Sequence, residues 1–241
     1  MKTWTTTNGL KIHRISNGVY NCFLISCRGK HLLVDTGREN DWKKLRQKLD
    51  KLEVTGSLLT GLILTHSHYD HAGNAANIKK IFNARIMIHK READYLRSGE
   101  NPAIHGTTFF TGFITEGLSH WYLTRFCGYK PVDCDITVED RYDLNDFGFN
   151  AYLLHTPGHT PGSISVIIEN EIAIVGDALF GVLQGSAWPP VATDSGLMVE
   201  SWERLLNTGC SIYLPAHGTE RSRELLQRQY KKHKRIQDHQ L

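Results

Sequence analysis

The strongest constraint on the fold is a repeated pattern in which a short apolar strand runs directly into residues that can bind a metal. The segment 61–65 reads Gly-Leu-Ile-Leu-Thr and leads into His66, His68, Asp70 and His71, four ligand-type side chains within six residues. Alternation along an extended chain would put the first two histidines on one side, and the start of a helix would bring the other two donors back toward them. A lone histidine is usually structural, but packing gives no comparable reason for this spacing. The imidazole and carboxylate groups of this cluster suit zinc, iron or manganese.

Three later segments repeat the pattern with a single donor each. Tyr-Leu-Leu-His-Thr-Pro-Gly leads to His159, Ile-Ala-Ile-Val-Gly leads to Asp177, and Ile-Tyr-Leu-Pro-Ala leads to His217. Loops at strand ends can converge because the sheet fixes where they begin. Together with the first cluster these residues supply the donors that a two-ion site uses. We therefore predict a site for two divalent metal ions, with zinc as the first choice and iron or manganese as alternatives.

The order of the expected elements predicts the α/β class. We expect strands at 10–15, 20–26, 31–34, 61–65, 85–89, 151–155, 163–168, 172–175 and 211–214, with helices at 40–52, 71–82, 197–207 and from 220 onward. Early strands in each half resemble hairpins, whereas later strands alternate with helices. This order favours an αββα sandwich of two mixed sheets flanked by helices over a doubly wound parallel sheet.

The chain is expected to form a single domain over 1–241 with one insertion. The range 93–139 fits neither half, because it is rich in aromatic residues and interrupted by glycines. It predicts short helices and loops, and long insertions of this kind often serve as lids or binding loops.

Composition narrows the class of protein further. Hydrophobic residues make up 40% of the 241 positions and charged residues 22%, as in ordinary soluble proteins, and a net charge of +3 is too small to indicate nucleic acid. The five cysteines include no C-x-x-C pair, which argues against a disulfide framework and a thiolate zinc site. The first ten residues lack an apolar signal region, and no apolar run reaches the ~18 residues of a membrane span. We predict a cytoplasmic protein with a small-molecule substrate and no membrane partner; the sequence carries no signal for an oligomeric state.

Five landmarks in order resemble the metallo-β-lactamase-fold hydrolase superfamily. They are Val-Asp-Thr-Gly at 34–37, the cluster at 66–71, His-Thr-Pro-Gly-His-Thr-Pro-Gly-Ser at 155–163, Gly-Asp-Ala-Leu-Phe at 176–180 and Pro-Ala-His-Gly at 215–218. The resemblance implies the metallo-β-lactamase fold and a dinuclear site. The first ion would be held by His66, His68 and His159, the second by Asp70, His71 and His217, with Asp177 bridging them and Asp35 orienting the ligand loops from behind.

The implied reaction is hydrolysis by water activated on the two ions, with Asp70 passing a proton to the leaving group. With His71 and Asp177 as ligands, the chain resembles the glyoxalase-II-like and lactonase-like branches rather than the zinc β-lactamases that use a cysteine ligand. The chain departs from both branches after Asp177: it lacks the Gly-Cys-Gly-Arg stretch that grips glutathione, and Phe180 stands where lactonases carry tyrosine. We expect an ester, thioester or lactone substrate, with Phe180 and Trp188 as apolar pocket walls.

Two other activities remain open at this point. A mononuclear-iron persulfide dioxygenase would keep nearly the same ligands, and metal content would distinguish it. A phosphodiesterase or nucleic-acid-binding role would use the basic residues of the expected C-terminal helix, although such a run is usually a solvated face. Those residues are Arg221, Arg223, Arg228, Lys231, Lys232, Lys234 and Arg235.

Overall fold

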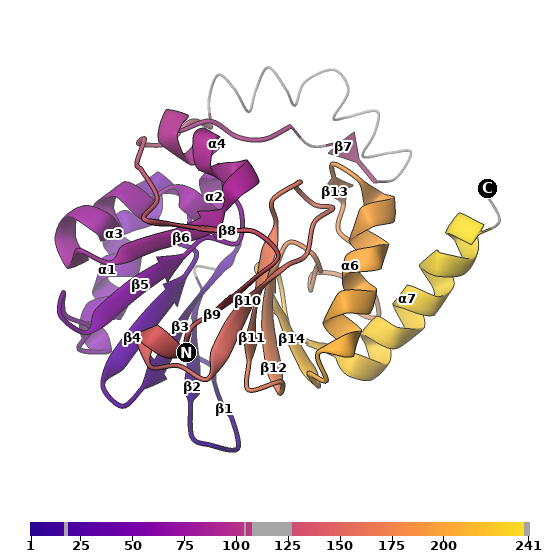
Figure 1. The fold of residues 1–241 in the computed structure, drawn as a ribbon, viewed down its shortest axis with the longest axis horizontal. Coiled ribbons are helices and arrows are strands. Elements are labelled where there is room, and N and C mark those ends of the chain that lie inside the picture. The colour runs from indigo at the N-terminus through magenta and orange to yellow at the C-terminus, as the bar shows by residue number, and fades with distance from the viewer. Residues whose placement is uncertain (17–18, 104, 108–126, 239–241) are drawn as a thin grey trace.

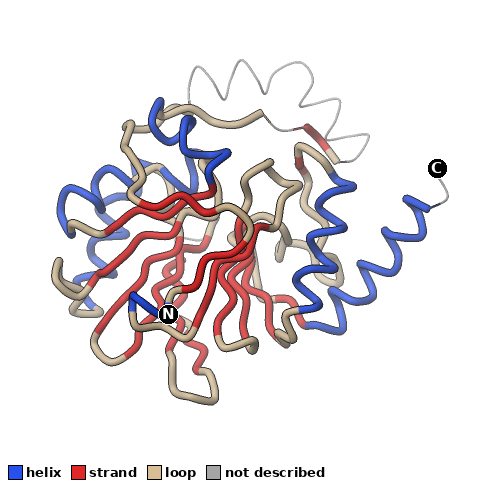
Figure 2. Tube along the Cα trace, viewed as in Figure 1, coloured by secondary structure: helices blue, strands red, loops and turns tan. Residues whose placement is uncertain are grey.

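Two β-sheets face each other in the computed structural model, which describes residues 1–16, 19–103, 105–107 and 127–238 (Figures 1 and 2). In spatial order the first sheet contains β1 Thr3–Thr5, β2 Lys11–Ser16, β3 Asn21–Cys27, β4 Lys30–Val34, β5 Leu59–Ile63, β6 Arg85–His89 and β8 Ile136–Val138. The second contains β15 Arg221–Ser222, β14 Ile212–Pro215, β12 Ile172–Gly176, β11 Ile164–Ile168, β10 Ala151–His155 and β9 Arg141–Asp143. A third, two-stranded ribbon pairs β13 Val191–Ala192 with β7 His105–Gly106.

Both large sheets are mixed, as the sequence predicts. The strands β1 to β4 pair antiparallel, whereas β4, β5, β6 and β8 pair parallel. In the second sheet only the pair β12 and β14 is parallel. The described helices are η1 Glu39–Asp41, α1 Trp42–Lys51, α2 Tyr69–Ala72, α3 Ala75–Phe82, η2 Lys90–Glu92, α4 Ala93–Ser98, η3 Asn145–Phe147, α6 Ser195–Asn207 and α7 Arg223–Asp238.

Three buried apolar layers hold this sandwich together. Strand alternation sends Leu24 into the layer beneath α1 and α3, while its neighbours Phe23 and Ile25 enter the layer between the two sheets. A third layer lies between the second sheet and α6, where Trp202 is fully buried. Figure 1 shows α1 and α3 on one outer side and α6 and α7 on the other. The αββα prediction is therefore confirmed.

Some boundaries differ from those expected. The range predicted as one helix over 71–82 contains two helices, because Asn74 interrupts it. The Asn74 side chain donates hydrogen bonds to the backbone oxygens of Thr36 and Arg38. The short strands β1, β8 and β9 were not predicted, and β8 lies within 93–139 but pairs with β6. Most of the aromatic residues in that range lie outside the described residues.

Two further observations bear on the predicted class. None of the five cysteines, all of which the structure describes, forms a disulfide. No helix in the described part of the chain has the length and apolar character needed to cross a bilayer.

Candidate metal centre

All seven predicted donors meet at one end of the sandwich, in the loops that follow the strands. The cluster at 66–71 follows β5, His159 lies between β10 and β11, Asp177 follows β12, and His217 follows β14. The donors form three groups, and within each group the ligand atoms all lie within 4.8 Å of one another. The groups are His66 with His68 and His159, His66 with His71 and Asp177, and Asp70 with His71 and His217.

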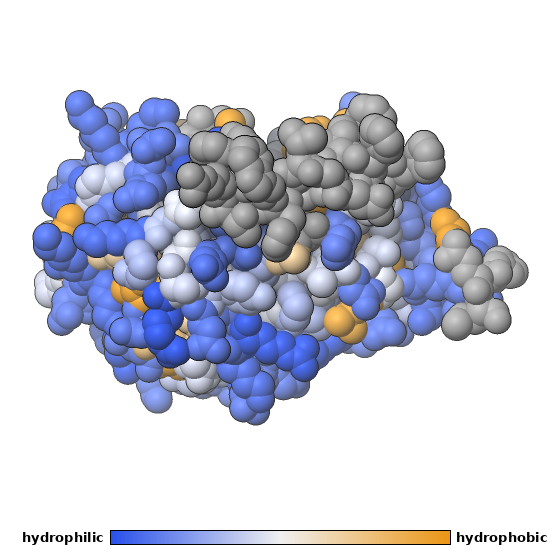
Figure 3. Space-filling view, turned by 90° about the horizontal axis from the view of Figure 1, so that it is seen from above, coloured by the Kyte–Doolittle hydropathy of each residue, from blue (hydrophilic) through white to orange (hydrophobic). Residues whose placement is uncertain are grey.

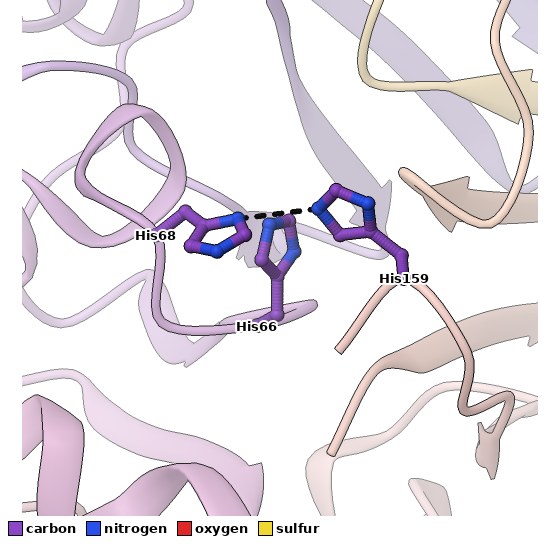
Figure 4. Close-up of side chains that lie close together, drawn as sticks. All are labelled: His66, His68 and His159. Atoms are coloured by element: carbon purple, nitrogen blue, oxygen red, sulfur yellow. Dashed lines mark hydrogen bonds between the residues drawn. The ribbon is translucent and has the colours of Figure 1, made fainter. Parts of the chain in front are cut away.

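The first group consists of three buried histidines (Figure 4). His68 Nδ1 lies 3.2 Å from His159 Nε2. The outer nitrogen of each ring already has a partner: His68 Nε2 lies 3.2 Å from the Pro102 carbonyl, and His159 Nδ1 lies 3.0 Å from the Val191 carbonyl. A carbonyl can only accept, so both outer nitrogens carry hydrogen and both inner ones present lone pairs. Two facing lone pairs repel unless a cation lies between them, and nitrogens bound to one tetrahedral zinc are about 3.3 Å apart.

Asp70, His71 and His217 form what is called here the second group, and it is more open than the first group of His66, His68 and His159. His71 Nε2 lies 3.9 Å from Asp70 Oδ1, and His217 Nε2 lies 3.6 Å from Asp70 Oδ2. His217 Nδ1 donates to the Val19 carbonyl at 3.0 Å, which again turns the other nitrogen inward as an acceptor. The side chains of Asp70 and His217 are 15% and 13% exposed, against 1% for His71. Solvent therefore reaches the centre from the Asp70 and His217 side.

Asp177 lies between the two groups. Its Oδ2 is 3.5 Å from both His159 Nε2 and His217 Nε2, and its Oδ1 is 3.6 Å from His71 Nε2. Buried polar atoms normally have partners, yet His66 Nε2, His71 Nε2 and Asp177 Oδ1 have no hydrogen bond within the described structure. Orphaned acceptors that converge on one point are what a metal site requires, so these residues fit divalent ions.

The pKa shifts reflect the same convergence. Burial lowers the pKa of His66 and His68 well below the ordinary value, and it also lowers the pKa of His159. Burial acts against charge at Asp177 too, but the surrounding imidazoles, led by His217, hold the pKa of this carboxyl far below its usual range. The three imidazoles of the first group are therefore neutral donors, and the ionised Asp177 beside them favours a cation.

Asp35 lies directly behind the cluster, where its carboxylate connects the ligand His71 with Thr65, the residue before His66. Its Oδ2 accepts from His71 Nδ1 at 2.9 Å, and its Oδ1 accepts from the Thr65 backbone N–H at 2.8 Å. Although burial opposes it, the charge of Asp35, together with that of Asp177, raises the pKa of His71 well above its ordinary value. Asp35 adopts a left-handed backbone with φ of 59°, an uncommon conformation for a residue with a side chain. The strain is offset by the bonds that fix the His71 ring.

A further buried carboxylate, that of Glu92 at the end of η2, was missed by the sequence reasoning. It is fully buried and accepts hydrogen bonds from both the backbone N–H and the hydroxyl of Ser67, and from the Gly162 N–H at 3.0 Å. Ser67 lies between two ligands, and Gly162 follows His159 by three positions, so Glu92 ties together the two loops that carry the first group. A Cβ at Gly162 would lie 2.5 Å from Glu92 Cγ, which makes this close approach possible only for glycine. Glu92 does not stand at a spacing typical of metal ligands, and only its tertiary contacts reveal its role.

The two residues expected as pocket walls lie in different surroundings. The Phe180 ring stacks on His217, with centroids 4.7 Å apart, and so borders the second group. The Trp188 ring stacks on His233 of α7, with centroids 3.9 Å apart, and lines a separate cavity beside that helix. The buried Arg221 holds the connecting loop by donating to the backbone oxygens of Phe180, Leu183 and Ser186, so it takes no part in a basic surface.

Comparison with known proteins agrees with this geometry. The sequence model of the family described as the metallo-beta-lactamase superfamily matches residues 16–217 of this chain. The chain belongs to this superfamily.

Its relatives are similar at low identity. A probable metallo-hydrolase of Methanocaldococcus jannaschii is 28% identical over 160 residues, 66% of this chain and 67% of the relative. A hydroxyacylglutathione hydrolase of Haemophilus influenzae is 30% identical over 164 residues, 66% of each chain. The matches therefore span about two thirds of these relatives. Among solved structures, an archaeal superfamily protein from Sulfolobus tokodaii has a TM-score of 0.65 at 21% identity, covering 92% of this chain and 85% of that one, which shows a shared fold.

Proposed function

We propose that this chain is a metal-dependent hydrolase that binds two divalent ions, zinc in first place, and cleaves an ester, thioester or lactone. The observation that carries the proposal is the orientation of the imidazoles. In His68, His159 and His217 the outer nitrogen donates to a backbone carbonyl, which leaves the inner nitrogen free to bind a metal. The relatives named as metallo-hydrolase and hydroxyacylglutathione hydrolase support the reaction class.

The residues divide between two ions. His66, His68 and His159 would hold the first ion, and Asp70, His71 and His217 the second. Asp177, with one oxygen directed at His71 and the other at His159 and His217, would contact both. When bound, such ions lower the pKa of water toward about 7 and polarise a carbonyl group.

The chain itself would supply orientation, shielding and a proton path. Asp35 and Glu92 fix the ligand loops, and the burial of the first group keeps bulk water away from it. Asp70 is the donor best placed to hold a proton for the leaving group, because it is the carboxylate of the cluster most exposed to solvent.

Elemental analysis of protein purified without added metal tests the proposal. We expect two zinc ions per chain. Asp177→Ala should lower the occupancy of both ions, whereas His217→Ala should mainly weaken binding of the second. One tightly bound iron with no second metal would instead favour a persulfide dioxygenase, and equal retention of both ions in both variants would refute the bridging role.

A substrate panel then tests the reaction class. Activated esters, acyl thioesters and lactones, assayed with zinc, manganese and iron in turn, should be hydrolysed in preference to a bis-aryl phosphodiester. A clear preference for the phosphodiester would contradict the carbonyl assignment while leaving the metal site in place.

A further inference from the structure

A polar cavity of about 490 Å³ lies beside α2, the helix that carries Asp70 and His71. Its walls come from the loop after β4, from Tyr69 and from residues 127–129. Tyr69 directly precedes Asp70 in α2, so one short helix contributes both to the cavity wall and to the more open group of donors. Cavities of this volume commonly bind small organic ligands.

The cation of this cavity, Arg38, is held in a defined position. Its guanidinium lies over the Tyr69 ring, 5.1 Å from the centroid, and its Nη2 donates to the Tyr69 hydroxyl at 3.2 Å. Its backbone is fixed as well, because its N–H donates to the Tyr20 hydroxyl and its carbonyl accepts from the Asn74 side chain. An arginine restrained in this way loses little further conformational freedom when it binds a ligand.

Arg38 forms no direct ion pair with a described carboxylate, although Glu39 and Asp41 lie nearby. No Asp or Glu oxygen in the described part of the chain lies within 4.0 Å of this guanidinium, and none of those residues accepts a hydrogen bond from Nε or Nη1. The neighbouring Asp41 is already paired with Lys44 at 2.9 Å and accepts from Tyr20. Figure 3 shows a face on which hydrophilic residues predominate, seen from above the view of Figure 1. Nη2 carries two N–H groups, and only one of them donates to Tyr69. The other can act with the neighbouring N–H on the same edge to bind a carboxylate through both oxygens.

We infer that Arg38 and Tyr69 form a subsite for a carboxylate group on the substrate, several bonds away from the carbonyl that is cleaved. The inference rests on the proposed hydrolase function and names its substrate class: an ester or thioester that carries a single carboxylate. One negative charge fits better than two, because Glu39 lines the same cavity and would repel a dianion. The apolar walls expected from the sequence do not describe this side of the site.

Matched substrates test the subsite. The p-nitrophenyl monoester of glutaric acid carries a carboxylate in the acyl part, and p-nitrophenyl valerate is its neutral counterpart. Butyryl thioesters of 3-mercaptopropionate and of its methyl ester place the same contrast in the leaving group. The measured quantity is the ratio of kcat/KM for the charged substrate to kcat/KM for the neutral one, and the arm with the larger ratio shows which part of the substrate reaches the subsite.

Three variants give opposite expectations for that ratio. Arg38→Gln should lower it about tenfold, the loss expected for one charge-assisted contact. Glu39→Gln should raise it severalfold, because it removes a repelling charge. Arg46→Gln, which removes a surface arginine paired with Asp50 on α1, should leave the ratio unchanged. A ratio that stays the same in both cavity variants, or a wild type that prefers neutral substrates in both arms, would overturn the subsite.

Failure of the hydrolase proposal would have a different signature. If no ester or thioester is cleaved with any metal, calorimetric binding of glutaramate, which carries one carboxylate, and of valeramide, which carries none, to the zinc-loaded protein still examines the subsite. Wild type should bind glutaramate at least fivefold more tightly than valeramide, and Arg38→Gln should lose most of that preference. Equal affinities in wild type would reject the carboxylate subsite.

Discussion

Replacing Glu92 by glutamine examines how the first group of histidines is held in place. The carboxylate accepts three hydrogen bonds, two from Ser67 and one from Gly162. Glutamine keeps one accepting oxygen and introduces an NH₂ group that cannot accept. If the oxygen stays on Ser67, the Gly162 N–H faces another donor, and one buried charge-assisted bond is lost.

The expected loss of stability follows from that single bond. Hydrogen bonds to charged groups contribute about 1.5–3 kcal/mol, part of which is offset because a neutral amide is cheaper to bury than a carboxylate. For a chain of this size a change of about 1–2 kcal/mol lowers Tm by roughly 2–8 °C. The affinity for the first ion should fall as well, because Glu92 fixes the two loops that carry the ligands of that ion.

Stepwise competition with a chromophoric zinc chelator measures the two affinities separately. We expect Glu92→Gln to weaken the first ion and to leave the second close to wild type. Asp35→Asn should show the reverse, because Asp35 binds the His71 ring of the second group. The exposed Glu200→Gln on α6 serves as the control for loss of a carboxylate. Two ions weakened equally by Glu92→Gln would refute the assignment of Glu92 to the first group.

Three further predictions concern proton transfer, pH and backbone packing. Asp70→Asn should keep most of the metal but lose turnover, most strongly for poor leaving groups; equal losses for activated and unactivated esters would exclude proton transfer by this residue. Burial, reinforced by a neighbouring imidazole, lowers the pKa of His89 to about 4, so the unfolded chain takes up a proton first and folding stability falls as pH drops below about 6.5. The free energy of unfolding can be measured with urea at pH 6.5 and pH 5, in the presence of a metal chelator. It should fall less between these pH values for His89→Asn than for wild type, and equal losses would contradict this prediction. Gly176→Ala should cost about 2–4 kcal/mol, because φ is +52° and the new Cβ would lie 2.7 Å from Thr65 Oγ1, whereas Gly29→Ala, with positive φ but open space, should cost about 1 kcal/mol; similar costs would reject the packing contact.

The donors could be predicted from sequence because their signal is local. A strand that ends in a ligand-type residue shows both its direction and its chemistry within a few positions, as at His159 and Asp177. The mixed sheets followed from the order of hairpins and helices. Short strands such as β8 and β9 were missed because three residues are too few to establish an alternating pattern.

Features that depend on tertiary contact lay beyond this reasoning. Glu92 follows a strand like many surface glutamates, and its role arises only because two distant loops meet it. Trp188 follows the Asp177 landmark by eleven positions, yet the chain turns and stacks its ring on α7. The cavity at Arg38 gave no sequence signal, because an arginine after Asp-Thr-Gly has no distinctive spacing.

The donors of the first group are contributed by both sheets, and this arrangement has a consequence for the life of the protein in a cell. His68 and His159 are 91 positions apart and belong to opposite halves of the sandwich. An ion bound between them would act as a cross-link, because it closes a long loop in the folded state that the unfolded chain leaves open. Metal starvation would remove that cross-link and make the apolar layer between the sheets easier to expose to proteases. The amount of this protein in a cell is therefore expected to follow the metal supply, even when its synthesis is constant.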